Sequence, residues 1–591
     1  MSTVESLAVY ETYQDIFGRK STYDELIKDV SVFNQKSVLW ICATIVTGMQ
    51  LWNNLESQPY GAFCKLIGQM FDKRLRHRLD LGWWQAHPRR VLFHRRQVLL
   101  IAKIAILHCS IDGIDARNNA NLFGNILLKA NDQLDHGLFA SLAKTSTKLS
   151  ERAECAKLIT EMLAVGEYSS PDIITVYTRN HLLMTRFTEL NRSHNDFVDI
   201  AYEYEKFTGV TLREYEAMSF AVHSRFGGQL SKEIEKIPGA LPLKVENFDA
   251  TSISREKVLS FLKTISAVPT VLANELRKES GANDLTIFRK YPLILQYYNL
   301  HLKSGWCGYL MMDALFVLDK ILTGPYWYAN AKCSSRLHRF WGAVFESYVN
   351  ELMQRMCDGT QSKFIKDPRP ISYPDIQICD GILLHGDSIV LMEYKSNMFR
   401  ADTKYSGDHE ALAKEIENKF VCNRESGRRK GVLQLAEAVK LLFGSGNKYV
   451  VQGINPISIK NVYLYLVTLD AIGGTMGMSP FLGSFLEARM LDAYPNLSIK
   501  PFLCSDVDSL EYVGNCFHYT SLPEIMDKLL QEDSTGAIPM QAIDLSRYSC
   551  NRNDWVATEW TKIYNDILKI LFPNVAAEAA IQDAMHPGND S

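Results

Sequence analysis

Apolar residues recur every three or four positions through the first 235 residues or so, for example over 98–109 and 156–166. This spacing places them along one side of an α-helix. The segment 237–252 holds two prolines and a glycine and has no helical periodicity, and the helical pattern then resumes. We therefore expect a helical N-terminal domain over 1–236 and a second helical domain or linker over 253–330.

The pattern changes after a second break at 323–335. An amphipathic helix is predicted around 336–356, and short runs rich in aliphatic and β-branched residues follow it. Helix, strands, helix and strand in this order are typical of an α/β architecture. Residues 331–520 are therefore predicted to form an α/β domain with a central mixed sheet, and 521–591 a helical C-terminal segment. The fold class is a multidomain α+β protein.

The composition is that of a soluble globular protein, with 47% hydrophobic and 22% charged residues. A chain of 591 residues is too long for one ordinary core, so several domains are expected. The net charge of −3 gives no overall attraction to nucleic acid, so a polyanion would have to bind at local basic patches. The longest apolar stretch falls short of a membrane span, so no membrane partner is expected.

Twelve cysteines are scattered singly along the chain, and neither a C-x-x-C pair nor a zinc-site spacing occurs. Most lie in apolar runs, where a free thiol behaves as a small hydrophobic side chain. The N-terminus lacks the basic and apolar regions of a signal peptide. Together these features predict a reducing, cytoplasmic location.

The strongest chemical signal is a predicted β-hairpin that contains Asp380, Glu393 and Lys395. Gly386 and Asp387 supply the turn. The second strand is apolar enough to be buried on both faces, yet it ends in a glutamate and a lysine. Residues two apart on a strand face the same way, so Glu393 and Lys395 project together. Asp380 on the partner strand is expected to reach the same patch.

Two carboxylates that converge on one point repel each other unless a cation lies between them. Hard oxygen ligands of this kind suit Mg²⁺ or Mn²⁺. A neighbouring lysine can orient or deprotonate a water and stabilise developing phosphate charge, and a metal lowers the pKa of that water. This combination of groups predicts phosphodiester hydrolysis.

Asp380, followed after twelve residues by Glu393-Tyr394-Lys395, resembles the PD-(D/E)XK nuclease superfamily, which includes restriction endonucleases. The resemblance covers about 335–475 and implies a restriction-endonuclease-like domain. It also implies that Asp380 stands on the second core strand, that Glu393 and Lys395 stand on the third, and that the carbonyl of Tyr394 joins the two carboxylates as a metal ligand.

The same resemblance suggests two assisting residues. Many superfamily members supply a glutamate from the preceding helix, which corresponds to Glu346, and a glutamine from the following helix, which corresponds to Gln434. Each residue also has a plainer interpretation as an ordinary helix-surface side chain. Gly342 in the middle of the helix of Glu346 would cost about 1 kcal/mol against alanine, which indicates close packing there.

Three alternatives stay open. Glu393 and Lys395 could be a surface pair with Asp380 capping a turn, and Asp375 could replace Asp380 as the first carboxylate. The loop before Gln434 is basic, and its position predicts phosphate contacts, although it could equally be a solvated surface. The residues that we expect to bind nucleic acid are Lys404, Arg424, Arg428, Arg429 and Lys430.

We therefore expect a Mg²⁺- or Mn²⁺-dependent endonuclease that acts on DNA in preference to RNA. The superfamily's habits suggest a role in defence against foreign DNA, and the helical region would select the substrate or bind a protein partner. One rival is a non-catalytic nucleic-acid- or protein-binding scaffold that keeps the fold without the metal. Another is a ribonuclease.

Overall fold

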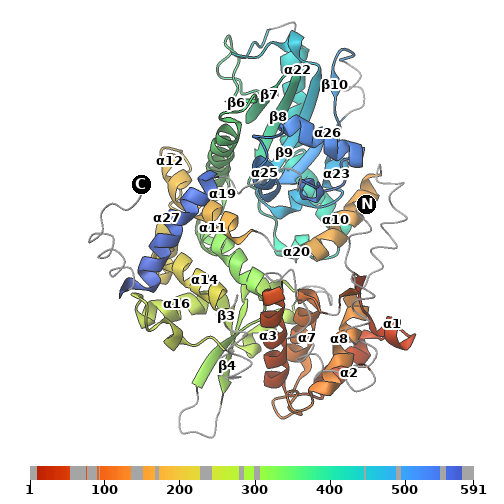
Figure 1. The fold of residues 1–591 in the computed structure, drawn as a ribbon, viewed down its shortest axis with the longest axis vertical. Coiled ribbons are helices and arrows are strands. Elements are labelled where there is room, and N and C mark those ends of the chain that lie inside the picture. The colour runs from red at the N-terminus through yellow and green to blue at the C-terminus, as the bar shows by residue number, and fades with distance from the viewer. Residues whose placement is uncertain are drawn as a thin grey trace, which may run out of the picture. The chain divides into compact units, whose positions relative to one another are not determined.

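The protein has a mixed α/β fold that divides into two compact units (Figure 1). Unit 1 comprises Met1–Gly137, Ile200–Tyr328 and Ile563–Ser591, and unit 2 comprises Leu138–Asp199 and Ala329–Lys562. The computed structural model describes residues 9–52, 75, 90–91, 93–134, 151–166, 172–226, 242–278, 285–298, 306–444, 448–486, 494–545 and 554–574. The units interleave along the chain, so they do not coincide with the four consecutive segments expected from the sequence.

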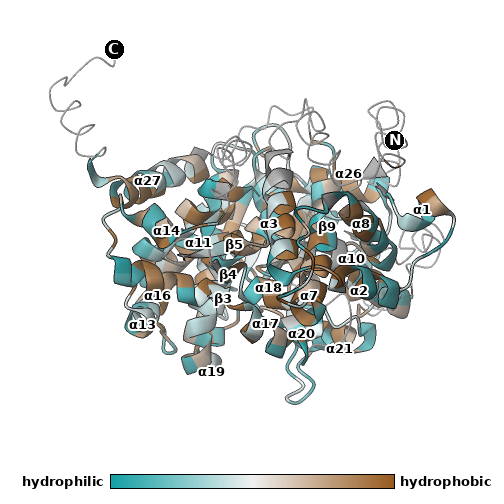
Figure 2. Ribbon diagram, turned by 90° about the horizontal axis from the view of Figure 1, so that it is seen from below, coloured by the Kyte–Doolittle hydropathy of each residue, from teal (hydrophilic) through white to brown (hydrophobic). Residues whose placement is uncertain are grey.

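Unit 1 is mainly helical. Helix α7 (Arg95–His108) is buried at every position from 96 to 106, whereas α16 (Arg255–Ile265) buries one side only. Figure 2 shows the hydrophobic and hydrophilic residues of α16 separated around the helix, as expected where one side packs on a core. The other elements wholly in this unit are β1 Val9–Tyr10, α1 Tyr13–Phe17, α2 Tyr23–Ser31, α3 Gln35–Trp52, β2 Arg90–Val91, α8 Ala120–Leu134, α13 Ile200–Thr208, α14 Leu212–Phe226, η4 Val245–Phe248, β3 Ser266–Ala267, α17 Pro269–Leu276, α18 Thr286–Lys290, β4 Leu293–Tyr298 and β5 Trp306–Met311.

The helical prediction for 253–330 is wrong at β4 and β5. These strands pair in antiparallel register, with Leu293 opposite Met311, and β3 adds to β4 in parallel. A short apolar run such as 293–298 satisfies helical and strand spacing equally well. Pairing between these two strands decided the structure, and the periodicity of either run alone does not contain that information.

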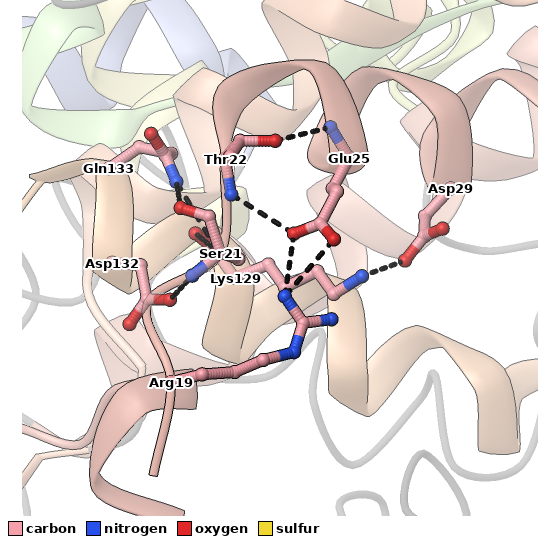
Figure 3. A network of polar contacts seen from close by, with 8 residues as sticks. All are labelled: Arg19, Ser21, Thr22, Glu25, Asp29, Lys129, Asp132 and Gln133. Carbon is pink, nitrogen blue, oxygen red and sulfur yellow. Dashed lines mark hydrogen bonds and ion pairs between the residues drawn. The ribbon is translucent and has the colours of Figure 1, made fainter. Parts of the chain in front are cut away.

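A polar network fixes the start of α2 on α8 in unit 1 (Figure 3). Asp132 accepts hydrogen bonds from the backbone N–H of Ser21 at 2.6 Å and of Gln14 at 3.0 Å. Thr22 and Glu25 cap α2 reciprocally, because each side chain accepts a hydrogen bond from the other residue's N–H. The loop before α2 is therefore held by a buried carboxylate rather than by apolar contacts.

Replacing Asp132 with alanine should destabilise unit 1 by about 2–4 kcal/mol, since two backbone donors would lose a charged acceptor. Urea unfolding followed by circular dichroism would measure this loss. Asp132→Asn keeps one acceptor oxygen and should cost less. Equal stability of the alanine variant and the wild type would contradict the importance of this network.

Unit 2 is built on a mixed sheet in the order β10–β9–β8–β7–β6, with β11 also paired to β9 (Figure 1). The pairs β6–β7 and β7–β8 are antiparallel, whereas β8–β9, β9–β10 and β9–β11 are parallel. The strands are β6 Lys363–Lys366, β7 Gly381–His385, β8 Ser388–Lys395, β9 Asn461–Thr468, β10 Ser498–Ile499 and β11 Leu503–Asp506. This part of the chain has the alternation of helices and strands expected from its sequence.

A hydrophobic core covers one face of this sheet. Ile389 and Leu391 of β8 pack there with Val432, Leu435 and Val439 of α22. The helical elements of unit 2 are α10 Arg152–Gly166, α11 Ile173–Leu182, η2 Leu183–Phe187, α12 Thr188–Leu190, α20 Ala401–Lys404, α21 His409–Phe420, α22 Gly431–Phe443, η5 Pro456–Ser458, η6 Ala471–Gly474, α23 Met478–Gly483, α25 Val507–Gly514, α26 Leu522–Glu532 and η7 Met540–Ala542.

Two helices carry the chain across the unit boundaries, α19 (Ala314–Cys357) and α27 (Asp554–Leu571). The break predicted at 323–335 is therefore mostly helix, with a kink where Cys333 has non-helical dihedral angles (φ −126°, ψ 24°). Cys333 precedes two serines, and serine pairs are a recognised cause of sharp kinks. The part of α19 after the kink is the helix predicted at 336–356.

The cysteines whose side chains the structure describes fall into two groups. Cys516 is disulfide-bonded. Disulfides are uncommon in a reducing compartment, so this bond does not support the cytoplasmic location, which stays a prediction. The free thiols are those of Cys42, Cys109, Cys155, Cys333, Cys357, Cys379, Cys422 and Cys504.

Along the described ranges, no helix combines the length and hydropathy that a membrane crossing requires.

Candidate active site

The predicted hairpin is confirmed as β7 and β8. Ser388 pairs with His385 across a two-residue turn, in which Gly386 has a positive φ of 58°. Only glycine adopts this backbone conformation without strain. Asp380 immediately precedes β7 and donates its backbone N–H to the carbonyl of Met392 at 3.1 Å. The hairpin therefore brings Asp380 beside the end of β8, where the sequence predicted it.

Glu393 and Lys395 project together from the end of β8. The Lys395 ammonium donates to Glu393 Oε2 at 2.7 Å, and their side chains are 15% and 2% exposed, respectively. They lie on the sheet face that packs against α22, because Ile389 and Leu391 occupy the same alternating positions. This pair is buried, so the alternative of a solvated surface pair does not describe it.

Asp380 contacts the backbone between these two residues. Its Oδ2 accepts the N–H of Tyr394 at 2.7 Å. On a strand, the N–H and C=O of one residue point toward the same neighbour. The Lys395 carbonyl accepts from Leu469, which follows β9, so the Tyr394 carbonyl points the other way, to the Asp380 side. Two carboxylates and one carbonyl thus gather at one corner of the sheet.

Glu346 approaches the same corner from α19. Its side chain is half-buried and forms no hydrogen bond within the described residues. Burial, together with the charges of Asp380, Asp367 and Glu393, raises its pKa to about 8. An ordinary solvent-facing helix glutamate would not show this shift. The helix preceding the sheet therefore does deliver a carboxyl group to the hairpin.

The four ionisable groups perturb one another. Burial raises the pKa of Glu393 to about 7, against the opposing effect of Lys395, and burial also raises the pKa of Asp380. The pKa of Lys395 is raised, because the nearby Glu393 and Asp380 outweigh the burial of its ammonium. Lys395 therefore stays charged at neutral pH, while the carboxyl groups resist ionisation.

This donor set fits a hard divalent cation, which would relieve the repulsion among the carboxylates. In the part of the chain that the structure describes, no three Asp, Glu, His or Cys side chains are arranged as a metal-chelating group. The set expected here has two such side chains, Asp380 and Glu393, together with the carbonyl of Tyr394. A cation held by two carboxylates and one carbonyl would therefore not require a group of three chelating side chains.

The pH dependence of stability tests this electrostatic description. Because the pKa of Glu346 is raised from 4.5 to about 8, the folded chain holds a proton that the unfolded chain loses between these values. The free energy of unfolding therefore falls as pH rises through this window. Without divalent metal, Glu346→Gln should be more stable than wild type at pH 9, by about 1–2 kcal/mol after allowance for partial exposure.

Thermal unfolding of the two proteins in a chelating buffer from pH 5 to 9 would measure this difference, which should narrow toward pH 5. The exposed Glu425 provides the control, and Glu425→Gln should follow the wild-type curve. A constant difference at all pH values would show that Glu346 does not titrate in this window.

Helix α22 begins against Lys395. A β-carbon placed on Gly431 would lie 3.6 Å from Lys395 Cε and 2.7 Å from the carbonyl oxygen of Phe420. Gln434 stands one turn further on, partly buried, and its side chain makes no hydrogen bond to another described residue. The structure thus brings the start of α22 to the site, but shows no contact between the Gln434 amide and the carboxylates.

The basic loop forms a small hairpin between α21 and α22. The side-chain oxygen of Asn423 accepts a hydrogen bond from the backbone N–H of Ser426, and the backbone N–H of Asn423 donates to the carbonyl of Arg428. Cys422 and Arg429 form an antiparallel β-bridge. Arg424, Arg428 and Arg429 are exposed, although Arg424 pairs with Glu417 and Arg429 with Glu437.

Two lysines predicted to bind nucleic acid are held by protein groups. The Lys430 ammonium donates to the Asn418 carbonyl at 2.8 Å and is half-buried. Lys404 is buried, and its ammonium pairs with the equally buried Asp470 at 2.8 Å. Burial removes Lys404 from any surface that a phosphate could reach, so its position indicates a structural role instead.

Asp367 is a site residue that the sequence reasoning missed. It follows β6, its N–H donates to the Asp380 carbonyl at 3.1 Å, and its charge raises the pKa of both Glu346 and Asp380. The Asp-Pro pair at 367–368 signals a turn, but no sequence feature connects that turn with the hairpin. Asp375, the alternative first carboxylate, is exposed in a turn.

Comparison of the chain with models of protein families, with curated proteins and with solved structures gave no match in any of the three. The chemistry of the site itself is therefore the basis for inferring function.

Proposed function

We propose that this protein is a metal-dependent nuclease of the PD-(D/E)XK type that hydrolyses phosphodiester bonds in DNA. The observation that carries the proposal is the convergence of Glu346, Asp380, Glu393 and Lys395 at one end of β8. The order of elements supports it, because α19 precedes β6, β7 and β8, and α22 leads to β9. Asp380 adjoins the second strand of this sheet, and Glu393 and Lys395 end the third.

Asp380, Glu393 and the Tyr394 carbonyl are the groups that would hold Mg²⁺ or Mn²⁺. Such an ion, when bound, lowers the pKa of a water molecule and polarises a phosphoryl oxygen. Lys395 is charged and nearly buried, so it can keep Glu393 ionised and stabilise negative charge on the phosphate in the transition state.

Glu346 is better suited than Lys395 to accept a proton from the attacking water. A general base works best when its pKa lies near the operating pH. The pKa of Glu346 is raised to about 8, whereas that of Lys395 is raised above its ordinary value of 10.5. We therefore assign proton transfer to the Glu346 carboxyl group and charge stabilisation to the Lys395 ammonium.

A non-catalytic scaffold is the second candidate. The direct bond between Lys395 and Glu393 favours it, because this internal ion pair neutralises one carboxylate without a metal. In that case the same residues would stabilise the hairpin, and the protein would bind its partner without cleaving it.

Cleavage assays on single- and double-stranded DNA and RNA, with Mg²⁺, Mn²⁺ or EDTA, distinguish these functions. The nuclease proposal expects metal-dependent cleavage of DNA by the wild type and its loss in Asp380→Ala. Faster cleavage of RNA would favour a ribonuclease. Cleavage unchanged in Asp380→Ala and Lys395→Ala would overturn the site, and the absence of both cleavage and metal binding would favour the scaffold.

A further inference from the structure

The loop that joins β6 to β7 is anchored directly on the candidate active site. Besides the bond from Asp367 to the Asp380 carbonyl, the N–H of Ile378 donates to the Pro368 carbonyl at 3.0 Å. Further along, the N–H of Ile371 donates to the carbonyl of Val450 at 2.9 Å. Residues 367–371 are thus fixed on both sides, so their side chains are presented at defined positions.

Asp367 has a strained backbone. Its φ of 44° is the one positive value among the non-glycine residues that the structure describes. The following residue is Pro368, and the residue before a proline is normally held in an extended conformation. Strain of this kind persists where the surroundings enforce it and is concentrated at functional sites. The loop would avoid this strain with glycine at 367 but would then lose the carboxylate.

The Asp367 carboxylate holds Arg369. Arg369 Nε donates to Asp367 Oδ2 at 2.9 Å, and Nη1 donates to the carbonyl of Pro374, also at 2.9 Å. Nη2 has no hydrogen-bond partner within the described ranges, and the side chain is 42% exposed. Two bonds therefore fix the plane of the guanidinium group while one nitrogen stays available to a ligand.

This guanidinium group lies at the edge of the carboxylate corner. The pKa of Arg369 is raised chiefly by Asp367 and also by Asp375 and Glu346, so its charge interacts with the cluster. A phosphodiester that enters a corner with several carboxylates meets strong repulsion. An arginine beside that corner supplies compensating charge together with planar donors that match phosphate oxygens.

We propose that Arg369 binds a phosphate of the nucleic-acid substrate next to the scissile one, and that Asp367 is the residue that positions it. This inference rests on the proposed nuclease function. It adds an arginine that no feature of the sequence singled out, and it gives a reason for the strained aspartate one residue before a proline.

The first test compares the cleavage kinetics of wild type, Arg369→Gln and Arg369→Lys on one short DNA duplex. Loss of an oriented guanidinium–phosphate contact should raise KM by about 10-fold in the glutamine variant. The lysine variant should reverse only part of this increase in KM, because an ammonium group lacks the planar pair of N–H donors of a guanidinium group. The exposed Arg192, which pairs with Glu189, is the matched control, and Arg192→Gln should leave KM unchanged.

Neutral methylphosphonates placed singly along the duplex locate the contact. At one position beside the cleaved bond, the methylphosphonate should raise the KM of wild type. It should not raise the KM of Arg369→Gln, because this variant already lacks the contact between the guanidinium group and that phosphate. Equal sensitivity of both proteins at every position would overturn the inference. A wild-type chain that cleaves neither DNA nor RNA would instead contradict the nuclease proposal and this inference with it.

The positioning role of Asp367 is tested with Asp367→Gly, which suits the positive φ but removes the carboxylate. The variant should unfold at a temperature no lower than wild type, while its KM rises by about 3-fold, since Arg369 loses one of its two anchors. An unchanged KM would show that Asp367 does not position Arg369. A loss of thermal stability in step with activity would show a purely structural role.

Discussion

Alanine in place of Lys395 is expected to lower the rate of DNA cleavage by about 10²–10³-fold, the range for removal of a group that stabilises transition-state charge. Its ammonium is nearly buried and lies 2.7 Å from Glu393 Oε2. The variant would lose a fixed positive charge at the place where the phosphate must enter. It would also leave Glu393 buried without its cation, which favours the protonated form of this carboxyl group.

Single-turnover cleavage with saturating enzyme measures the rate of the cleavage step without a contribution from substrate affinity. Lys500 provides a matched control, since it also pairs with a carboxylate, that of Asp527, in unit 2 but beside the start of β9, whereas the site lies beside the end of β9. Lys500→Ala should cleave at the wild-type rate. A Lys395→Ala variant that stays folded and cleaves within about threefold of wild type would contradict the assigned role, because that ratio is worth less than 1 kcal/mol.

Removal of Arg179 is expected to produce a large loss of stability, about 3–5 kcal/mol for Arg179→Ala, as for other broken buried ion pairs. Arg179 of α11 is buried and lies 2.5 Å from carboxylate oxygens of both Asp508 and Glu511. Glu511 also accepts a hydrogen bond from Tyr348 of α19, the helix that carries Glu346. Without Arg179, the buried Glu511 carboxyl group would lose its cation.

Urea unfolding of wild type and Arg179→Ala would measure the loss. A second variant, Arg179→Met combined with Glu511→Leu, replaces the charged pair with apolar side chains of similar size and should recover much of the stability. A decrease of less than about 1 kcal/mol in the free energy of unfolding of the alanine variant would contradict this expectation. It would mean that solvent compensates for the lost ion pair, as it does at exposed sites.

The hairpin of the candidate site could be predicted because all its signals are local. The Gly386 turn, the apolar strand after it and the Glu393–Lys395 ending lie within a few residues of one another. Spacing along a strand fixes which side chains share a face. The predicted convergence with Asp380 followed from the pairing of neighbouring strands, which a two-residue turn enforces.

Other features could not be predicted because they depend on contacts that the local pattern of residues does not encode. Strand β4 pairs with β5, and its apolar run had the spacing of a helix as well. The contribution of Asp367 follows from the return of the β6–β7 loop to the Asp380 carbonyl. Likewise, the division into interleaved units depends on packing between segments that are not consecutive along the chain.

The central claim is that the carboxylates at the end of β8 form one cation-binding site, and Mn²⁺ binding measured by calorimetry tests it most directly. At pH 6.5 the raised pKa values of Glu346 and Glu393, about 8 and about 7, predict that binding releases protons. Glu393 must be ionised to bind the metal, and the charge of the cation favours the ionised form of the nearby Glu346. Titration in two buffers of different ionisation enthalpy counts these protons. We expect Mn²⁺ binding with proton release in wild type and severely weakened binding in Asp380→Asn. Binding of equal strength in both proteins, or no binding to wild type at pH 8, would contradict it.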